Sequence, residues 1–99
     1  MNNRMNKDDL LNLLNTLNID RNEFWLLSSS ALVLRGIYPD AGDLDIAVTK
    51  KGLEQLSNNY PLVKKDEEWY IVTDGIECIL DEMIGKKELV DNYYVQDIY

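Results

Sequence analysis

Histidine is missing from this 99-residue sequence, and cysteine occurs once, as Cys78. Without histidine, catalysis by a Ser-His or Cys-His pair and metal binding by imidazole are excluded. A single cysteine cannot form an internal disulfide, and it has no histidine partners with which to build a zinc site. The groups left for catalysis are carboxylates and lysines, together with a metal ion held by oxygen ligands.

Long hydrophobic runs are also missing. No apolar stretch approaches the roughly 18 residues that span a bilayer, and the first ten residues, MNNRMNKDDL, have no apolar signal-peptide core. We therefore expect no membrane association and a cytoplasmic location.

Hydrophobic residues make up 45% of the chain, which is typical of a folded protein. At this length we expect one domain, residues 1–99.

Basic residues are few, with 10 Lys and Arg against 18 Asp and Glu and a net charge of −8. A protein that holds nucleic acid mainly through phosphate contacts needs a basic face, so direct nucleic-acid binding is disfavoured. An anionic substrate would need a bound divalent cation or a local cluster of positive groups to offset the repulsion.

Segments of helical and strand periodicity alternate along the chain and predict an α+β fold, a mixed β-sheet flanked by helices. Helices are expected at 7–17 with Asn6 as N-cap, from the serines at 28–30 to Gly36, and from Thr49 to about Ser57. Strands are expected at 24–28, 43–48, 61–65, 68–73 and 76–84, with a hairpin turn at Asp74-Gly75. The segment 86–94 is expected to be a short helix followed by a tail.

Two aspartates alternate with apolar residues in the segment DLDIAV, residues 43–48. Side chains two residues apart in a strand leave the same face, so Asp43 and Asp45 lie about 7 Å apart on one side. Two carboxylates so placed suit Mg²⁺, and two-metal phosphoryl chemistry takes a third from a neighbouring strand. The candidates are Glu77 and Asp81, which share one parity. The alternative is that a half-exposed strand ordinarily alternates acidic and apolar residues.

Three serines, Ser28, Ser29 and Ser30, stand between a predicted strand and a predicted helix. The free N–H groups and the positive dipole end of a helix N-terminus can hold a phosphate. Serine is also among the most favoured N-cap residues, so capping alone would account for one of the three.

Residues 26–48 resemble the core motif of the nucleotidyltransferase-fold superfamily, the DNA polymerase β-like group. The resemblance is greatest to its small prokaryotic and phage members, including minimal nucleotidyltransferases and antitoxin-type relatives. Their pattern is an apolar strand, Gly-Ser or Gly-Gly, a helix that begins Ala-Leu and ends at Gly, a loop, and Asp-hydrophobic-Asp. Here it reads LLSSSALVLRG, IYPDAG and DLDIAV. Ser29 stands where the family usually has glycine, and residues 40–42 replace a common basic residue and hydroxyl residue.

The resemblance implies that Asp43 and Asp45 bind Mg²⁺, that Glu77 or Asp81 assists, and that the serines contact the phosphates of an NTP. The implied activity is transfer of a nucleoside monophosphate from the NTP to a hydroxyl, with release of pyrophosphate. One alternative is a catalytically degenerate domain of the same fold that acts through protein–protein contacts, as an antitoxin-like or phage accessory protein. Another is an acidic α+β domain unrelated to this superfamily.

Several aromatic side chains remain to be placed. Trp25 and Trp69 lie in apolar strand segments and are expected in the core. Tyr93, Tyr94 and Tyr99 could form an exposed patch for a protein partner or a homodimer, or could close the open end of the core.

Three further features have simple interpretations. Cys78 has the opposite parity to Glu77 and is expected to point into the core. Arg35 is expected to lay its stem along the helix and expose its charged head. The run KKDEE at 64–68 is expected to be a solvated turn.

Overall fold

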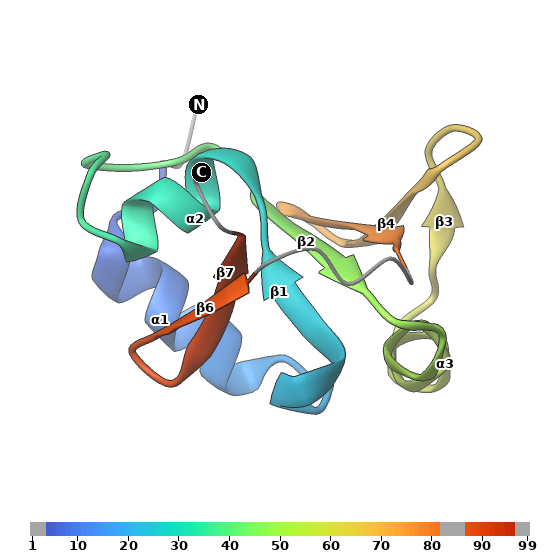
Figure 1. Ribbon diagram of the computed structural model, residues 1–99. Helices are drawn as coiled ribbons and strands as arrows, with labels where there is room; N and C mark the ends of the chain where they lie inside the picture. Colours follow the sequence, from blue (N-terminus) through green and yellow to red (C-terminus); the bar gives the residue numbers. More distant parts are fainter. Residues whose placement is uncertain (1–3, 82–86, 97–99) are drawn as a thin grey trace.

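The computed structural model describes residues 4–81 and 87–96, and within them it has an α+β fold built on one mixed sheet (Figure 1). The strands are β1 (Phe24–Leu26), β2 (Leu44–Val48), β3 (Val63–Lys64), β4 (Trp69–Thr73), β5 (Ile76–Leu80), β6 (Lys87–Val90) and β7 (Tyr93–Gln96). The helices are α1 (Lys7–Thr16), α2 (Ser28–Leu34) and α3 (Lys50–Asn59), with a 3-10 turn at Arg21–Glu23. The predicted fold class is confirmed.

The strand order is β3-β4-β5-β2-β1-β7-β6. β2 pairs with β5 in parallel and β1 pairs with β7 in parallel, whereas the other four neighbouring pairs are antiparallel. The strand predicted at 76–84 ends at Leu80, and its last three residues lie outside the described part of the chain. No helix among the described residues is long and apolar enough to cross a membrane.

The helix ends follow the local sequence signals. At the start of α1, the Asn6 side chain accepts the Asp9 N–H and the Asp9 carboxylate accepts the Asn6 N–H, which confirms the predicted cap. α2 ends before Gly36, whose φ of +81° suits glycine. α3 is capped by Thr49, whose hydroxyl accepts the Gly52 N–H.

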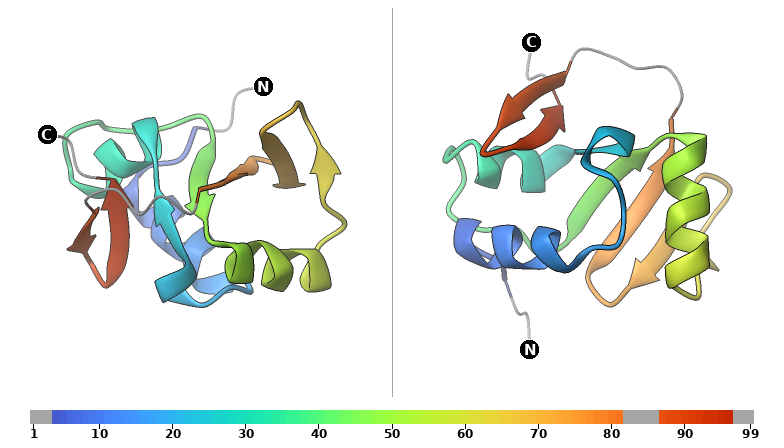
Figure 2. Two further views of the ribbon diagram at one scale, coloured as in Figure 1. Left: turned by 45° about the vertical axis from the view of Figure 1, so that its right-hand side comes forward. Right: turned by 90° about the horizontal axis from the view of Figure 1, so that it is seen from below.

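One face of the sheet carries the core. α1 and α2 pack together against it, and α3 lies beside the half of the sheet that contains β3 and β4 (Figure 2). The core cluster contains alternate residues of the strands together with apolar residues of all three helices, among them Leu10, Leu34, Ile46, Leu56 and Cys78. Burial raises the pKa of the Cys78 thiol to about 11, so its predicted place in the core is confirmed.

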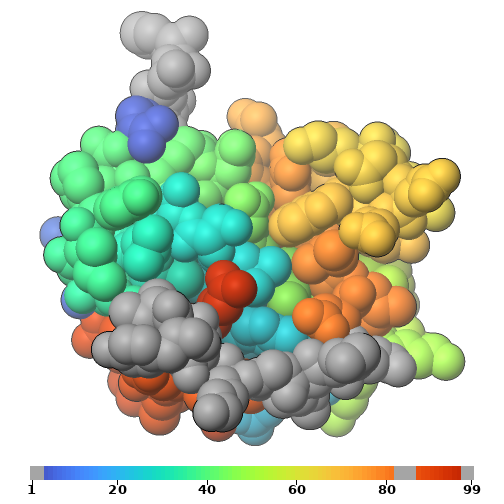
Figure 3. All heavy atoms as spheres, turned by 45° about the horizontal axis from the view of Figure 1, so that its top comes forward, coloured from blue at the N-terminus to red at the C-terminus, as the bar shows by residue number. Residues whose placement is uncertain are grey.

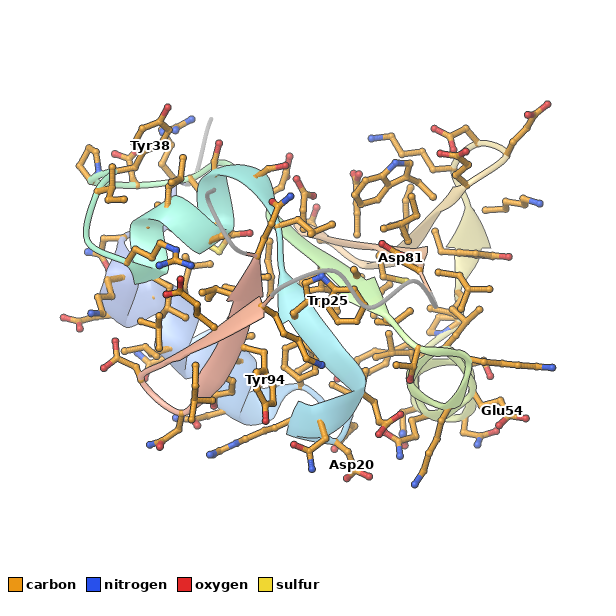
Figure 4. The ribbon with its side chains drawn as sticks, viewed as in Figure 1. Asp20, Trp25, Tyr38, Glu54, Asp81 and Tyr94 are labelled. Atoms are coloured by element: carbon orange, nitrogen blue, oxygen red, sulfur yellow. The ribbon has the colours of Figure 1, made fainter. Side chains whose placement is uncertain are left out.

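The opposite face, which we term the open face, carries the strand residues of the other parity. Trp25 is buried as predicted, but it lies on this face, outside the core cluster. The Lys87 ammonium lies 5.1 Å from the centroid of the Trp25 ring and 4.5 Å from that of the Tyr94 ring, and Figure 4 labels both residues beside β1. Trp69 is only partly buried and lies outside the core cluster, so its predicted place in the core is wrong: it pairs with Ile79 of β5, on the open face.

The helix predicted at 86–94 is wrong over the residues that the structure describes. Residues 87–90 and 93–96 form an antiparallel hairpin instead. Asp91 and Asn92 at its turn have φ values of +51° and +71°, which these residue types tolerate and which a two-residue hairpin turn of the primed type requires. Tyr93 and Val95 alternate into the core, as strand residues do, and Val95 pairs with Leu26 of β1.

Arg35 ties this hairpin to α2. Its guanidinium forms an ion pair with Glu88, Nη1 to Oε2 at 3.0 Å, and donates to the Gln96 carbonyl oxygen at 2.9 Å. The Arg35 side chain is only 11% exposed, so the expectation that it would expose its head is wrong.

Tyr93 is buried and donates its hydroxyl to Asn15, so it closes the core, whereas Tyr99 lies outside the described residues.

We expect Gly52→Ala to destabilise the protein, although alanine normally favours a helix interior over glycine by about 1 kcal/mol. A Cβ at Gly52 would lie 2.6 Å from the Glu23 carbonyl oxygen and 3.1 Å from Ile19 Cδ1. Crowding of this kind costs about 1–3 kcal/mol, measurable as a lower Tm by circular dichroism. Ser57→Ala on the exposed side of α3 is the control and should leave the Tm nearly unchanged. An increased Tm for Gly52→Ala would contradict this packing.

Candidate functional site

Three of the four predicted carboxylates lie together on the open face, where β2 and β5 run side by side. Asp45 of β2 is in register with Glu77 of β5, and neighbouring strands lie about 4.8 Å apart. Asp43 precedes β2 by one residue and is close enough to influence the charge of Asp45. In Figure 3 the light-green atoms of the β2 region lie recessed between residues 28–43 and the yellow turn that joins β3 to β4.

Asp81 does not join this group. It follows the end of β5, where its N–H donates to the Val48 carbonyl oxygen at 2.9 Å. Four residues along a strand correspond to about 13 Å, so Asp81 lies far from Asp45 although it has the parity of Glu77. Figure 4 shows Asp81 toward the end of the sheet that is nearer to α3. Of the two candidates that the sequence left open, the register places Glu77 beside the aspartates.

Lys65 also belongs to this site, although the sequence pattern did not predict it. Its ammonium donates to both carboxylate oxygens of Glu77, at 2.9 Å and 3.1 Å, and this contact raises the pKa of Lys65. Residues 64–68 are all exposed, as expected of a solvated turn, but Lys65 also pairs with Glu77. Because the Lys65 N–H pairs with the Trp69 carbonyl oxygen, the hairpin register turns Lys65 to the face of Glu77. If the pairing of β3 with β4 were known, the alternation of side chains along the strand would place Lys65 on the same face as Glu77.

The electrostatics of the site centre on Asp45. Partial burial raises the pKa of its carboxyl, the charges of Glu77 and Asp43 raise it further, and Lys65 opposes them. Three carboxylates thus lie near one lysine, which donates hydrogen bonds to Glu77 and interacts with Asp43 and Asp45 through its charge. Among residues 4–81 and 87–96, no three Cys, Asp or Glu side chains converge closely enough to hold a metal ion as the side chains now lie.

The serines occupy the turn from β1 into α2 and have different environments. Ser28 and Ser29 are exposed, and the Ser28 N–H donates to Gln96 Oε1 at 3.2 Å. Ser30 is buried, with its hydroxyl 2.7 Å from the Leu27 carbonyl oxygen and 3.2 Å from the Asp45 carbonyl oxygen. The Ser30 hydroxyl therefore fastens the start of α2 to β2, and a phosphate contact remains a prediction for all three serines.

The backbone strain of this turn falls on Ser28, whose φ is +52°. This is the left-handed region, which glycine adopts without strain and other residues adopt at a cost. The position at which glycine is favoured is thus Ser28 rather than Ser29, which lies inside α2.

No known family model matches this chain, and no curated protein or solved structure shows a significant match to it. The chemistry of the site is therefore inferred from its geometry and from the motif at residues 26–48.

We expect Ser28→Gly and Ser29→Gly to change stability in opposite directions. Relief of the positive φ at Ser28 should raise the free energy of unfolding by about 1 kcal/mol. Glycine inside the first turn of α2 should lower it by about 0.5–1 kcal/mol. Urea unfolding of the two variants measures both effects, and the reverse order would contradict the backbone conformation of this turn.

Asp45→Asn should stabilise the protein at pH 7. A raised pKa means that the folded state binds the proton more tightly than the unfolded state, so ionised Asp45 opposes folding above its folded pKa. The gain should therefore shrink as the pH falls through that pKa and vanish below the ordinary value of 3.8. Urea unfolding from pH 7 to pH 3.5 measures the gain, with Asp74→Asn in the β4–β5 turn as control for net charge. If Asp45→Asn raises the free energy of unfolding equally at every pH, the conclusion that ionised Asp45 opposes folding is wrong.

Proposed function

We propose that this protein is a nucleotidyltransferase that depends on a divalent cation, with Asp43, Asp45 and Glu77 as its carboxylate set. The reaction is transfer of a nucleoside monophosphate from an NTP to a hydroxyl, with release of pyrophosphate. The observation that carries the proposal is the pairing of Asp45 with Glu77 across two parallel strands, with Asp43 two residues before Asp45. The turn that begins α2 is bonded to the backbone of Asp45, as a phosphate-binding turn beside the metal ligands would be.

The donor set is of the type that Mg²⁺ takes, because all three side chains offer carboxylate oxygens. Lys65 neutralises Glu77 in the present arrangement, so a cation that binds Glu77 competes with Lys65 for its oxygens. The Lys65 side chain is 49% exposed, and an exposed ion pair contributes only about 0–1 kcal/mol, so displacement of Lys65 costs little. When bound, Mg²⁺ would supply charge neutralisation for the polyphosphate and activation of the attacking hydroxyl.

Lys65 is also placed to bind the phosphates of the substrate. The loop before β2 contains Asp40, Ala41 and Gly42, where related motifs commonly carry a basic residue. Lys65 reaches the carboxylates from the β3–β4 hairpin instead, so a lysine released from Glu77 is placed to pair with the anionic phosphates. It would offset part of the repulsion between an NTP and a chain of net charge −8.

A second candidate is a catalytically degenerate domain of the same fold that acts through protein–protein contacts. Two observations favour it: both oxygens of Glu77 are held by Lys65, and the Ser30 hydroxyl is held by backbone groups. In that case the carboxylates and Lys65 would form an internal ion-pair group and no nucleotide would bind.

The two candidates differ in ligand-induced stabilisation. We expect Mg²⁺ or Mn²⁺ with the correct NTP to raise the Tm, since a ligand at 100 times its Kd adds about 2.7 kcal/mol to the native state. The double variant Asp43→Asn with Asp45→Asn should lose this increase. Asp81→Asn is the matched control and should keep it, because Asp81 lies at the far end of β5.

The measurement is thermal unfolding with each of the four NTPs, with and without the metal, followed by an assay for pyrophosphate release. If no metal-dependent increase occurs, or if the double variant retains it, nucleotidyl transfer is wrong and the degenerate domain is favoured. If Asp81→Asn loses the increase and the double variant keeps it, the carboxylate set is wrong.

A further inference from the structure

An apolar groove lies between α3 and the ends of β4 and β5. Its volume is about 740 Å³, and its apolar wall consists of Leu53, Leu62, Tyr70 and Leu80. Leu80 is 43% exposed, although its strand neighbours Ile76 and Cys78 on the same face are buried. A strand of the core sheet therefore ends with an uncovered leucine.

Carboxylates border this groove. Glu54 lines it directly, and Figure 4 shows Glu54 on the outer side of α3. An adjoining depression of about 320 Å³ shares Tyr70 and Leu80 with the groove and is lined by Glu67 and Glu68. Within the described residues, none of these three glutamates is in an ion pair.

Two lysines of the described part of the chain also lie near the groove. Lys50 lines it, and the Lys64 ammonium lies 6.0 Å from the Tyr70 ring centroid. Glu54, Glu67 and Glu68 outnumber these two lysines, in a chain of net charge −8. A partner with positive charges beside its apolar residues is therefore attracted to this region, and one with negative charges is repelled.

We propose that this groove binds a cationic amphipathic segment of a protein partner. Its apolar side chains would pack against Leu53, Leu62 and Leu80, and its lysines or arginines would face Glu54, Glu67 and Glu68. An amphipathic helix laid in an apolar groove is a common mode of peptide recognition. The volume lies within the roughly 300–1,000 Å³ of ordinary ligand sites, which are lined mainly by apolar side chains with a few polar groups, as this groove is.

The groove is distinct from the proposed nucleotidyl site. Tyr70 and Leu80 have the parity of the core face, whereas Glu77 and Ile71 point to the open face. Asp43, Asp45 and Glu77 line neither the groove nor the adjoining depression, so the inference does not depend on the proposed activity.

The test uses fluorescence anisotropy with three labelled synthetic peptides of about four helical turns, or roughly 14 residues. The first has leucines at helical spacing with lysines between them, the second keeps the leucines with glutamates, and the third keeps the lysines with serines. We expect only the first to bind, with an affinity that falls as salt is added.

Two exposed leucines provide matched variants. Leu80→Arg should weaken binding by at least about tenfold, because it places a cation and a bulky side chain in the groove. Leu89→Arg is the control, because Leu89 is 60% exposed on β6 at the opposite edge of the sheet, and it should change the affinity by less than about twofold. Glu54→Gln with Glu67→Gln should weaken binding and reduce its salt dependence. Circular dichroism establishes that each variant is folded.

Three results would overturn the proposal. Equal binding of the lysine–serine peptide would mean general attraction to an acidic protein. Equal loss in Leu80→Arg and Leu89→Arg would place the contact outside the groove. A homodimer, seen by sedimentation, that Leu80→Arg dissociates would make a second copy the occupant. Metal-dependent and NTP-dependent stabilisation of Leu80→Arg should stay unchanged, so failure here is distinguishable from failure of the proposed activity.

Discussion

The parallel pairing of β2 with β5 is the contact on which the rest of this structure depends. It places Ile46 beside Cys78 on the core face and Asp45 beside Glu77 on the open face. A slip of one residue would turn the carboxylates toward the core and the apolar side chains toward solvent, at a cost that no surface contact could offset. Hydrophobic burial therefore sets the register, and the register brings the carboxylates together.

Local features of this fold could be predicted from the sequence, because each is decided by neighbouring residues. The Asn6 cap, the end of α2 before Gly36 and the alternation around Asp45 are of this kind. The choice between Glu77 and Asp81 could not be predicted, since it depends on a pairing between strands more than 30 residues apart in sequence. The resemblance of residues 26–48 to nucleotidyltransferases remains a prediction.

The error at 86–94 has the same physical origin. Lys87, Glu88 and Leu89 are good helix formers, so local propensity favoured a helix. The hairpin is stabilised instead by distant partners: Leu26 pairs with Val95, and Arg35 binds Glu88. Lys65 was missed because its position on the open face depends on the pairing of β3 with β4. In each case tertiary contacts outweighed local preference.

The place of β7 has a consequence for how the chain folds. β1 pairs with β2 on one side, and along its other edge the strand that pairs with it is β7, whose residues follow about 70 positions later in the chain. Until residues 93–96 emerge from the ribosome, a nascent sheet has an unpaired edge beside the apolar side chains of Phe24 and Leu26. Such an edge can pair with other chains. Pairing with β7 covers this edge of β1. A chain whose synthesis stalls before residues 93–96 would keep the edge exposed and would be prone to aggregate.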